Sequence, residues 1–299
     1  MSLLNVKKGK MLGPQVHTIY GNNGVGKSTL AASFPASIFL DLEDGSKHLD
    51  VSRLESKELK TVASIRAILK ELMSPKAEYK TVVIDSIEAL ESVIYDDICK
   101  DSKVDSIELA MGGYGKGIVR SREIMREIMM DLQALKEFGI TSILVGHSHT
   151  KKHSDPNTNQ EWDRTVMRAN DKLAAVVKDL SDNVLFATFK VFTAKDNGKT
   201  KAVGDGQRVM YTQWRPSFDA KNRLELPLEL PLSYDAFVEA CEKKPEANVE
   251  ELLSEITELS KTLDPAIKAK MAEHMAKHKT NPAKLREVKN RIIELAMKN

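Results

Sequence analysis

Glycine, lysine and serine occur near the start of the chain at a spacing that suits phosphate binding. Residues 21–28 read Gly-Asn-Asn-Gly-Val-Gly-Lys-Ser, which fits the pattern G-x-x-x-x-G-K-[ST] of a phosphate-binding loop. Glycines let the backbone curl so that several N–H groups point inward at one anion. An apolar run at residues 16–20 precedes the motif, and an expected helix at residues 27–34 follows it and offers its N-terminus to the same anion. We therefore predict that these residues bind ATP.

Two side chains of this loop have expected catalytic roles. Lys27 is expected to reach the β- and γ-phosphates, and the Ser28 hydroxyl is expected to bind Mg²⁺. Nucleotide binding is assigned to the whole loop and the residue after it: Gly21, Asn22, Asn23, Gly24, Val25, Gly26, Lys27, Ser28 and Thr29.

A carboxylate for the magnesium ion is expected at the end of a second buried strand. Residues 81–85 form a continuous apolar run that ends in Asp85, as a parallel strand buried on both faces would. Paired with the loop, Asp85 is expected to hold the ion through water. Many ATPases place a glutamate directly after this aspartate, but here that position is Ser86. The group that activates water must therefore lie elsewhere.

Glu43 is the favoured candidate for this catalytic base, because it ends the apolar run at residues 37–42 and a neighbouring strand would deliver it to the γ-phosphate. Asp44 and Glu88 remain alternatives, and an ordinary solvated carboxylate is the simpler interpretation of Glu43. His147 follows the apolar run at residues 142–146, at the sheet edge where ligands bind in open α/β folds. It is expected either to sense the γ-phosphate or to be a hydrogen-bonded structural histidine.

Composition excludes some classes of protein and leaves others open. The 299 residues carry 45 Lys and Arg against 43 Asp and Glu, a net charge of +2 that neither supports nor excludes nucleic-acid binding. No apolar run approaches the length of a membrane span, and the basic first ten residues are not followed by a signal-peptide core. Cys99 and Cys241 match no metal or redox spacing. We expect a cytoplasmic protein with no membrane partner.

The elements that must position these residues alternate between strands and helices. Apolar runs at residues 16–20, 37–42, 81–85 and 142–146 are separated by stretches of helical periodicity, which predicts an α/β fold with a mainly parallel sheet flanked by helices. Residues 183–214 read as strands joined by turns and predict a hairpin-rich edge, whereas residues 149–169 read as a long irregular polar loop. We expect a core at residues 1–244 and a small helical extension at residues 245–299, joined by a linker at residues 243–248.

Taken together, these residues resemble the RecA recombinase family, most closely its short phage members, the RecA-like single-strand annealing ATPases. Residues 39–44 resemble the strand that ends in the family's catalytic glutamate, residues 83–86 its magnesium strand, and residues 144–147 its sensor strand, with His147 where RecA has glutamine. The resemblance implies a RecA-like fold and ATP hydrolysis in homologous recombination or annealing, in the bacterial host cytoplasm if the protein is phage-encoded. An N-terminal helical domain and a clear aromatic hook are missing from the pattern, which argues against a long filament.

A second part of the resemblance implies an oligomer. Residues 219–227 are similar to a segment of RecA whose cations reach the γ-phosphate of the neighbouring subunit. Carried over, Lys221 and Arg223 would complete the active site in trans, in a homo-oligomer with shared sites. The alternative is a solvated basic turn.

The resemblance also implies single-stranded DNA as a partner, bound by segments at residues 104–117 and 149–169. Cations there would pair with phosphates while aromatic rings stack on bases. The residues concerned are Tyr114, Lys116, Lys151, Lys152, Trp162, Arg164 and Arg168. A RecA-like regulatory or loader ATPase is the alternative; it would act on a protein partner, with the C-terminal helices as its docking element. A small-molecule kinase ranks last, because no arginine-rich lid is evident.

Overall fold

The computed structural model describes residues 13–74, 78–155, 160–196, 199–242 and 249–260, with further short stretches and single positions between 268 and 292. Side chains are described for these residues except 155, 192–203 and 249–252. The chain divides into two compact units, Met1–Val238 and Glu239–Asn299. The expected boundary at residues 244–245 and the expected linker fall at residues 243–248, outside the described part of the chain.

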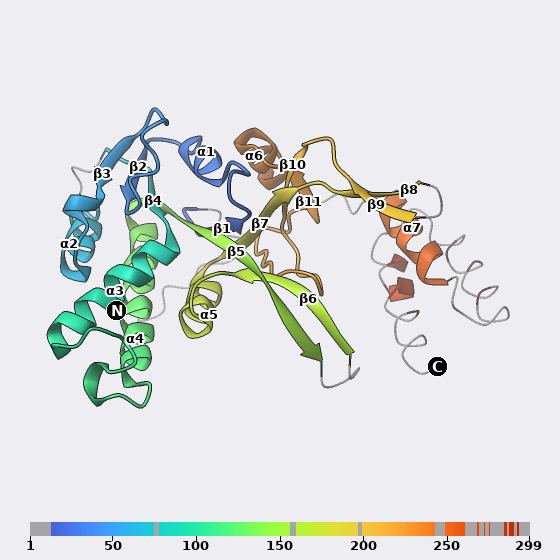
Figure 1. Cartoon of the computed structure of the whole chain (residues 1–299). Helices are drawn as coiled ribbons and strands as arrows, with labels where there is room; N and C mark the ends of the chain where they lie inside the picture. The colour runs from blue at the N-terminus through green and yellow to red at the C-terminus, as the bar shows by residue number, and fades with distance from the viewer. Residues whose placement is uncertain are drawn as a thin grey trace, which may run out of the picture. The chain divides into compact units, whose positions relative to one another are not determined.

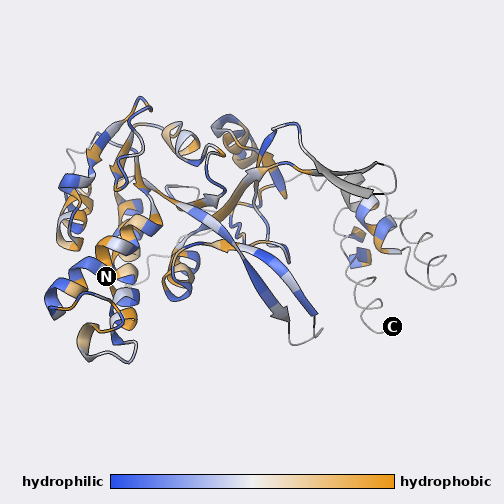
Figure 2. Cartoon of the chain, viewed as in Figure 1, coloured by the Kyte–Doolittle hydropathy of each residue, from blue (hydrophilic) through white to orange (hydrophobic). Residues whose placement is uncertain are grey.

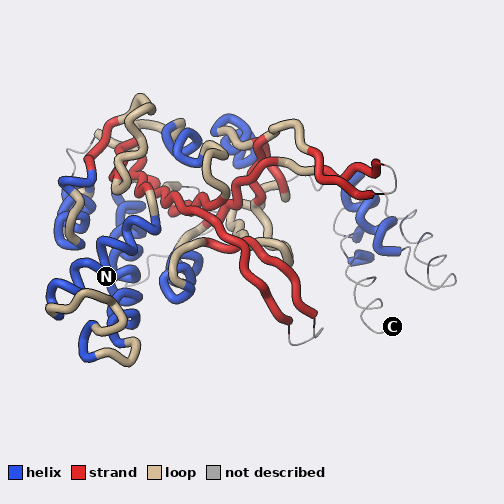
Figure 3. Tube along the Cα trace, in the orientation of Figure 1, coloured by secondary structure: helices blue, strands red, loops and turns tan. Residues whose placement is uncertain are grey.

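A mainly parallel sheet forms the centre of the first unit (Figures 1 and 3). Its strands are β1 (Val16–Gly21), β2 (Ser37–Asp41), β3 (Ser52–Glu55), β4 (Thr81–Asp85), β5 (Thr141–Asp155), β7 (Asn183–Phe189), β10 (Arg208–Tyr211) and β11 (Glu229–Pro231). Their order is β11-β10-β7-β1-β5-β4-β2-β3. Pairing is parallel from β7 through to β3, and β10 is antiparallel to both of its neighbours. The carboxyl ends of β1, β2, β4 and β5 therefore share one edge of the sheet.

Helices cover both faces of this sheet. They are α1 (Lys27–Ala32), α2 (Val62–Leu72), α3 (Ile87–Ser102), α4 (Lys116–Ala134), α5 (Asp171–Leu180) and α6 (Tyr234–Glu242), with 3-10 turns at Ser56–Glu58, Ala110–Gly112 and Leu135–Phe138. The main core joins apolar side chains of α2 to α5 to alternate strand residues such as Val16 and Tyr20. On the opposite face the ring of His17 packs against Phe34 and Phe237. Burial lowers the pKa of His17 to about 4, opposed by Asp182, so this ring is neutral at physiological pH.

A long antiparallel hairpin replaces the irregular loop that the sequence predicts at residues 149–169, so that prediction is wrong. Strand β5 continues beyond the sheet core to Asp155 and pairs with β6 (Gln160–Met167), with Lys151 opposite Arg164. Figure 2 shows that the projecting part of this hairpin is hydrophilic. Cross-strand hydrogen bonds satisfy its backbone without burial, so an apolar run is not needed to form it.

The remaining elements confirm the predicted fold class, an α/β fold with a mainly parallel sheet flanked by helices. The expected hairpin-rich edge holds β10, β11 and a separate two-stranded sheet of β8 (Phe192–Asp196) and β9 (Lys199–Val203). In the second unit, α7 (Val249–Leu259) buries Ile256 against Leu285, Val288 and Ile292. Within the described residues, no helix combines the length and apolar character that crossing a membrane requires.

Candidate active site

The phosphate loop (residues 21–28) connects β1 to α1, and its shape requires glycine at two of its positions. Gly21 lies so close to β7 that an added Cβ would meet the carbonyl oxygen of Ala187 at 1.9 Å. Gly26 has a φ of 103°, in the region that favours glycine. Within the loop, Val25 is buried, whereas Asn22, Asn23 and Gly24 are exposed, as is Thr29 just after it. The loop is therefore anchored by buried residues, and its backbone and short polar side chains face solvent.

Lys27 is folded back into the phosphate loop. Its side chain is buried, and Nζ donates hydrogen bonds to the carbonyl oxygens of Gly21 at 3.0 Å and Asn22 at 2.9 Å. Burial lowers the pKa of Lys27, and the carboxylates of Asp85, Glu88 and Glu43 oppose this shift. The structure thus places an ammonium group inside the loop, close to three acidic side chains.

Ser28 and Asp85 meet at the base of the loop. The Ser28 hydroxyl donates to Asp85 Oδ2 at 2.6 Å, because β1 and β4 both end at this edge of the sheet. Burial raises the pKa of Asp85, and the hydrogen bond from Ser28 opposes the shift. A hydroxyl and a carboxylate oxygen are hard ligands of the type Mg²⁺ takes when it retains most of its waters. The two residues therefore fit the predicted magnesium site.

Glu43 is held at the same edge by residues that the sequence interpretation did not use. Asp41, the last residue of β2, is buried and accepts hydrogen bonds from the backbone N–H groups of Gly45 at 3.0 Å and Ser46 at 2.8 Å. This fixes the turn that carries Glu43. The hydroxyl of Ser86 then donates to Glu43 Oε1. Ser86, which the sequence shows only as a missing glutamate, positions the glutamate that comes from the neighbouring strand.

The two alternative bases lie in different surroundings. Asp44 accepts hydrogen bonds from the backbone and hydroxyl of Ser56, and these bonds lower its pKa. Glu88 accepts from the backbone N–H of His147 at 2.9 Å, while its Oε2 is buried and has no hydrogen-bond partner among the described residues. One ligand atom each from Glu43, Glu88 and His147 lies within 4.8 Å of the others. Glu88 thus shares the site with Glu43, whereas Asp44 is engaged by Ser56.

His147 lies within β5, at the point where the pairing of this strand passes from β1 to β6. Its Nε2 lies 3.9 Å from Glu43 Oε2, and its Nδ1 is buried without a hydrogen-bond partner in the described structure. The next residue, Ser148, donates its hydroxyl to Asn22 Oδ1 at 3.1 Å. The start of the β5–β6 hairpin is therefore close to both the phosphate loop and Glu43, and the sensor role of His147 stays a prediction.

Lys221 and Arg223 lie near the amino end of β7, at the opposite end of the strands from the phosphate loop. Lys221 Nζ donates to the carbonyl oxygens of Lys178, Asp179 and Ser181, the last turn of α5 and the residue after it. Arg223 pairs with Asp182 at 3.0 Å and is more than half exposed. Lys221 thus has a structural role within its own chain. The predicted action of both residues in trans stays a prediction.

The residues assigned to DNA lie on two segments. On the hairpin, Lys151 pairs with Asp171 and Arg164 pairs with Asp219 at 2.5 Å, whereas Lys152 and Arg168 are exposed. Trp162 donates its indole N–H to the carbonyl of Pro216 at 2.9 Å. On the other segment, Tyr114 is 99% exposed and Lys116 begins α4. The exposed members that form no ion pair in the described structure are thus Tyr114, Lys116, Lys152 and Arg168.

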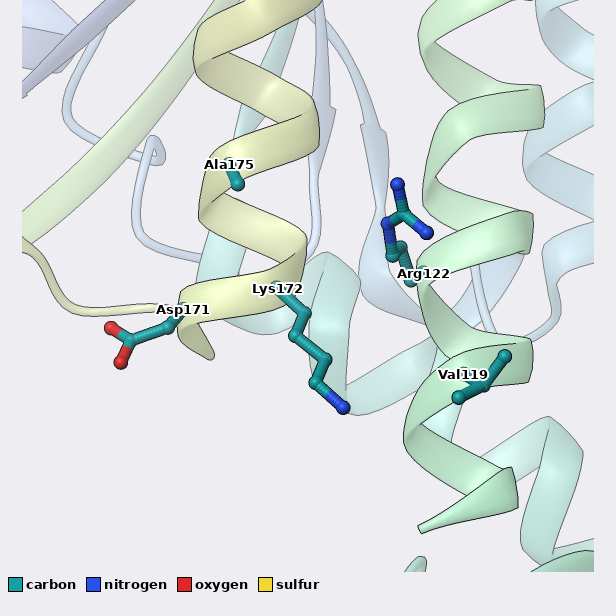
Figure 4. A pocket seen from close by; sticks show the side chains of 5 residues that line it. All are labelled: Val119, Arg122, Asp171, Lys172 and Ala175. Atoms are coloured by element: carbon teal, nitrogen blue, oxygen red, sulfur yellow. The ribbon is translucent and has the colours of Figure 1, made fainter.

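A groove of about 420 Å³ lies between α4 and α5 (Figure 4). Val119 and Arg122 of α4 line one side, and Asp171, Lys172 and Ala175 of α5 line the other. None of the five belongs to the phosphate loop or to the Glu43, Glu88 and His147 cluster, so the groove is not part of the candidate active site.

Comparison with known proteins identifies a family. The family model described as "AAA domain" matches residues 14–224. The chain is similar to the "SPbeta prophage-derived uncharacterized protein YorG" of Bacillus subtilis (strain 168), at 23% identity over 181 residues, which are 59% of this chain and 51% of that protein. This chain thus spans about half the length of that curated relative. It is also similar to the crystal structure of the KaiC-like protein PH0186 from Pyrococcus horikoshii OT3, at 13% identity and a TM-score of 0.37, over 73% of this chain and 85% of that one.

Replacing the base should separate ATP binding from ATP hydrolysis. Glu43→Gln keeps the size of the side chain and an oxygen for the Ser86 hydroxyl, but it cannot take a proton from water. We expect ATP affinity close to wild type and a hydrolysis rate about 10²- to 10⁴-fold lower, measured by calorimetry and phosphate release. Asp44→Asn is the matched control and should hydrolyse ATP at close to the wild-type rate. Wild-type hydrolysis by Glu43→Gln, with loss in Glu88→Gln, would move the base to Glu88.

Proposed function

We propose that this chain, which belongs to the AAA domain family and has a RecA-like P-loop ATPase domain, hydrolyses ATP while acting on single-stranded DNA in homologous recombination or annealing. The observation that carries the ATPase part is the meeting of Ser28, Asp85 and Glu43 at one sheet edge beside the phosphate loop. ATP is the substrate and Mg²⁺ the expected cofactor.

The residues of this site divide the hydrolysis reaction among them. The backbone of the phosphate loop and Lys27 bind the phosphates, and Lys27 stabilises the negative charge that develops on them. Ser28, and Asp85 through water, would hold Mg²⁺, which would supply charge neutralisation for the phosphates. Glu43, positioned by Ser86, orients the attacking water and accepts its proton. His147 and Ser148 link this chemistry to the β5–β6 hairpin.

Single-stranded DNA is the partner that the exposed residues support best. Tyr114 offers a fully exposed ring beside the exposed Lys116, which is the combination used to stack a base and pair a phosphate. Lys152 and Arg168 add exposed cations on and next to the hairpin that begins at the ATP site. The prophage origin of the relative agrees with a phage-type recombination role. Such a role would take place in the cytoplasm of the bacterial host.

DNA should accelerate ATP hydrolysis in a manner that depends on Tyr114. We expect an oligonucleotide of single-stranded DNA to raise the ATPase rate at low salt, and its affinity to fall steeply as salt increases. Tyr114→Ala should weaken DNA binding by about tenfold, since stacking contributes roughly 1–3 kcal/mol per base. Phe138→Ala removes another exposed ring, in the 3-10 turn after the carboxyl end of α4, and should have no effect on DNA binding.

The same assay distinguishes the alternative function. Absence of DNA binding and stimulation at low salt, together with turnover that rises only on adding a protein partner, would show a regulatory or loader ATPase. The C-terminal helices would then be the first place to search for the docking element.

Active sites shared between subunits should be detectable by mixing two inactive variants. In a homo-oligomer with head-to-tail contacts, a Lys27→Ala subunit still carries a normal Arg223. It can place that arginine at the intact phosphate loop of a neighbouring Arg223→Ala subunit. Arg223→Ala suits this test because Lys136 also pairs with Asp182 and would remain as its partner. Each variant alone should hydrolyse ATP poorly, and an equal mixture should restore activity in about a quarter of the sites if subunits assemble at random. Full activity of Arg223→Ala alone, or no recovery on mixing, would contradict action in trans.

A further inference from the structure

Arg208 lies against the phosphate loop, although neither its sequence context nor any motif marks it. Arg208 is the first residue of β10, and its backbone pairs with Phe189 at the carboxyl end of β7. Its Nη1 is 2.8 Å from the point that a Cβ on Gly26 would occupy, and Leu232 Cδ2 is 3.8 Å from the same point. The guanidinium thus occupies space that glycine leaves open in the loop.

The segment that carries Arg208 is packed beside α1. Leu232 donates its backbone N–H to the carbonyl of Arg208 at 3.1 Å, which joins β10 to the segment leading into α6. Tyr234 and Phe237 of α6 make ring contacts with Phe34, just after α1. Figure 1 shows α6 next to α1. The position of Arg208 relative to the loop is therefore set by packed elements and not by the loop alone.

The charge of Arg208 is not matched by a partner within the described chain. The guanidinium makes no hydrogen bond or ion pair to a described residue, and the side chain is exposed. Lys27, the residue after Gly26, already lies near the carboxylates of Asp85, Glu88 and Glu43. An arginine is always protonated, so the guanidinium of Arg208 beside Gly26 can pair with an anion held by the loop.

We propose that Arg208 binds a phosphate of the nucleotide held by its own chain's phosphate loop. The inference rests on the proposed function, since it needs a nucleotide in the loop, and it adds a contact in cis from β10. A guanidinium suits this role because it presents several N–H donors to phosphate oxygens in a fixed plane. The contact links ATP occupancy to β10 and through it to β7 and β11.

The test measures binding of ADP and of inorganic pyrophosphate to the full chain by calorimetry. Arg208→Gln should weaken both ligands by the same factor, about tenfold to a hundredfold, as expected for loss of a charge-assisted hydrogen bond. Arg208→Lys should restore part of the affinity. Arg122→Gln, which removes the same charge from an exposed position on α4, is the matched control and should bind both ligands as wild type does. Thermal unfolding without ligand should be unchanged in all variants.

Three results would overturn the inference. Unchanged affinity in Arg208→Gln would show that the guanidinium only packs on the loop. A loss for ADP that pyrophosphate does not share would assign Arg208 to the base or ribose instead of a phosphate. An equal loss in Arg122→Gln would show a general effect of net charge. Failure of the wild-type chain to bind ADP at all would instead overturn the proposed function, and this contact with it.

Discussion

Parallel pairing of β1, β5, β4 and β2 is the constraint on which the candidate site depends. In this register Gly21 pairs with His147, and Asp85 pairs with Val145 on one side and Asp41 on the other. The phosphate loop, Asp85, the turn that carries Glu43, and His147 therefore lie together at one edge of the sheet. A shift of one residue in any pair would turn alternate side chains to the other face of the sheet. The buried apolar residues on both faces prevent that shift.

Hydrogen bonds between polar side chains hold the residues at this shared edge in fixed positions. Asp41 fixes the turn after β2, Ser86 holds Glu43, and Glu88 binds the backbone of His147. Each of these contacts also satisfies a polar group that would be expensive to bury alone. The same side chains thus stabilise the fold and position Glu43 and His147.

The fold and the phosphate loop could be predicted from sequence because the central strands β1, β2, β4 and the first part of β5 are continuous apolar runs. Shorter or more polar strands could not be predicted in this way. Strand β3 (Ser52–Glu55) is too short and exposed to show a pattern, and the β5–β6 hairpin has polar residues on both faces. The roles of Ser86 and Arg208 could not be predicted, because each depends on a residue that is distant in sequence. Ser86 contacts Glu43, and Arg208 contacts Gly26. Lys221 shows the converse: a residue marked by family resemblance also caps a helix in its own chain.

The most direct test of the central claim is an experimental structure of the Glu43→Gln variant with ATP and Mg²⁺. The geometry predicts the phosphates inside residues 21–28, the metal between the Ser28 hydroxyl and the Asp85 carboxylate, and a water beside residue 43 facing the γ-phosphate. Nucleotide bound elsewhere on the chain, or a γ-phosphate out of reach of residue 43, would contradict the claim that these strand ends form one hydrolytic site.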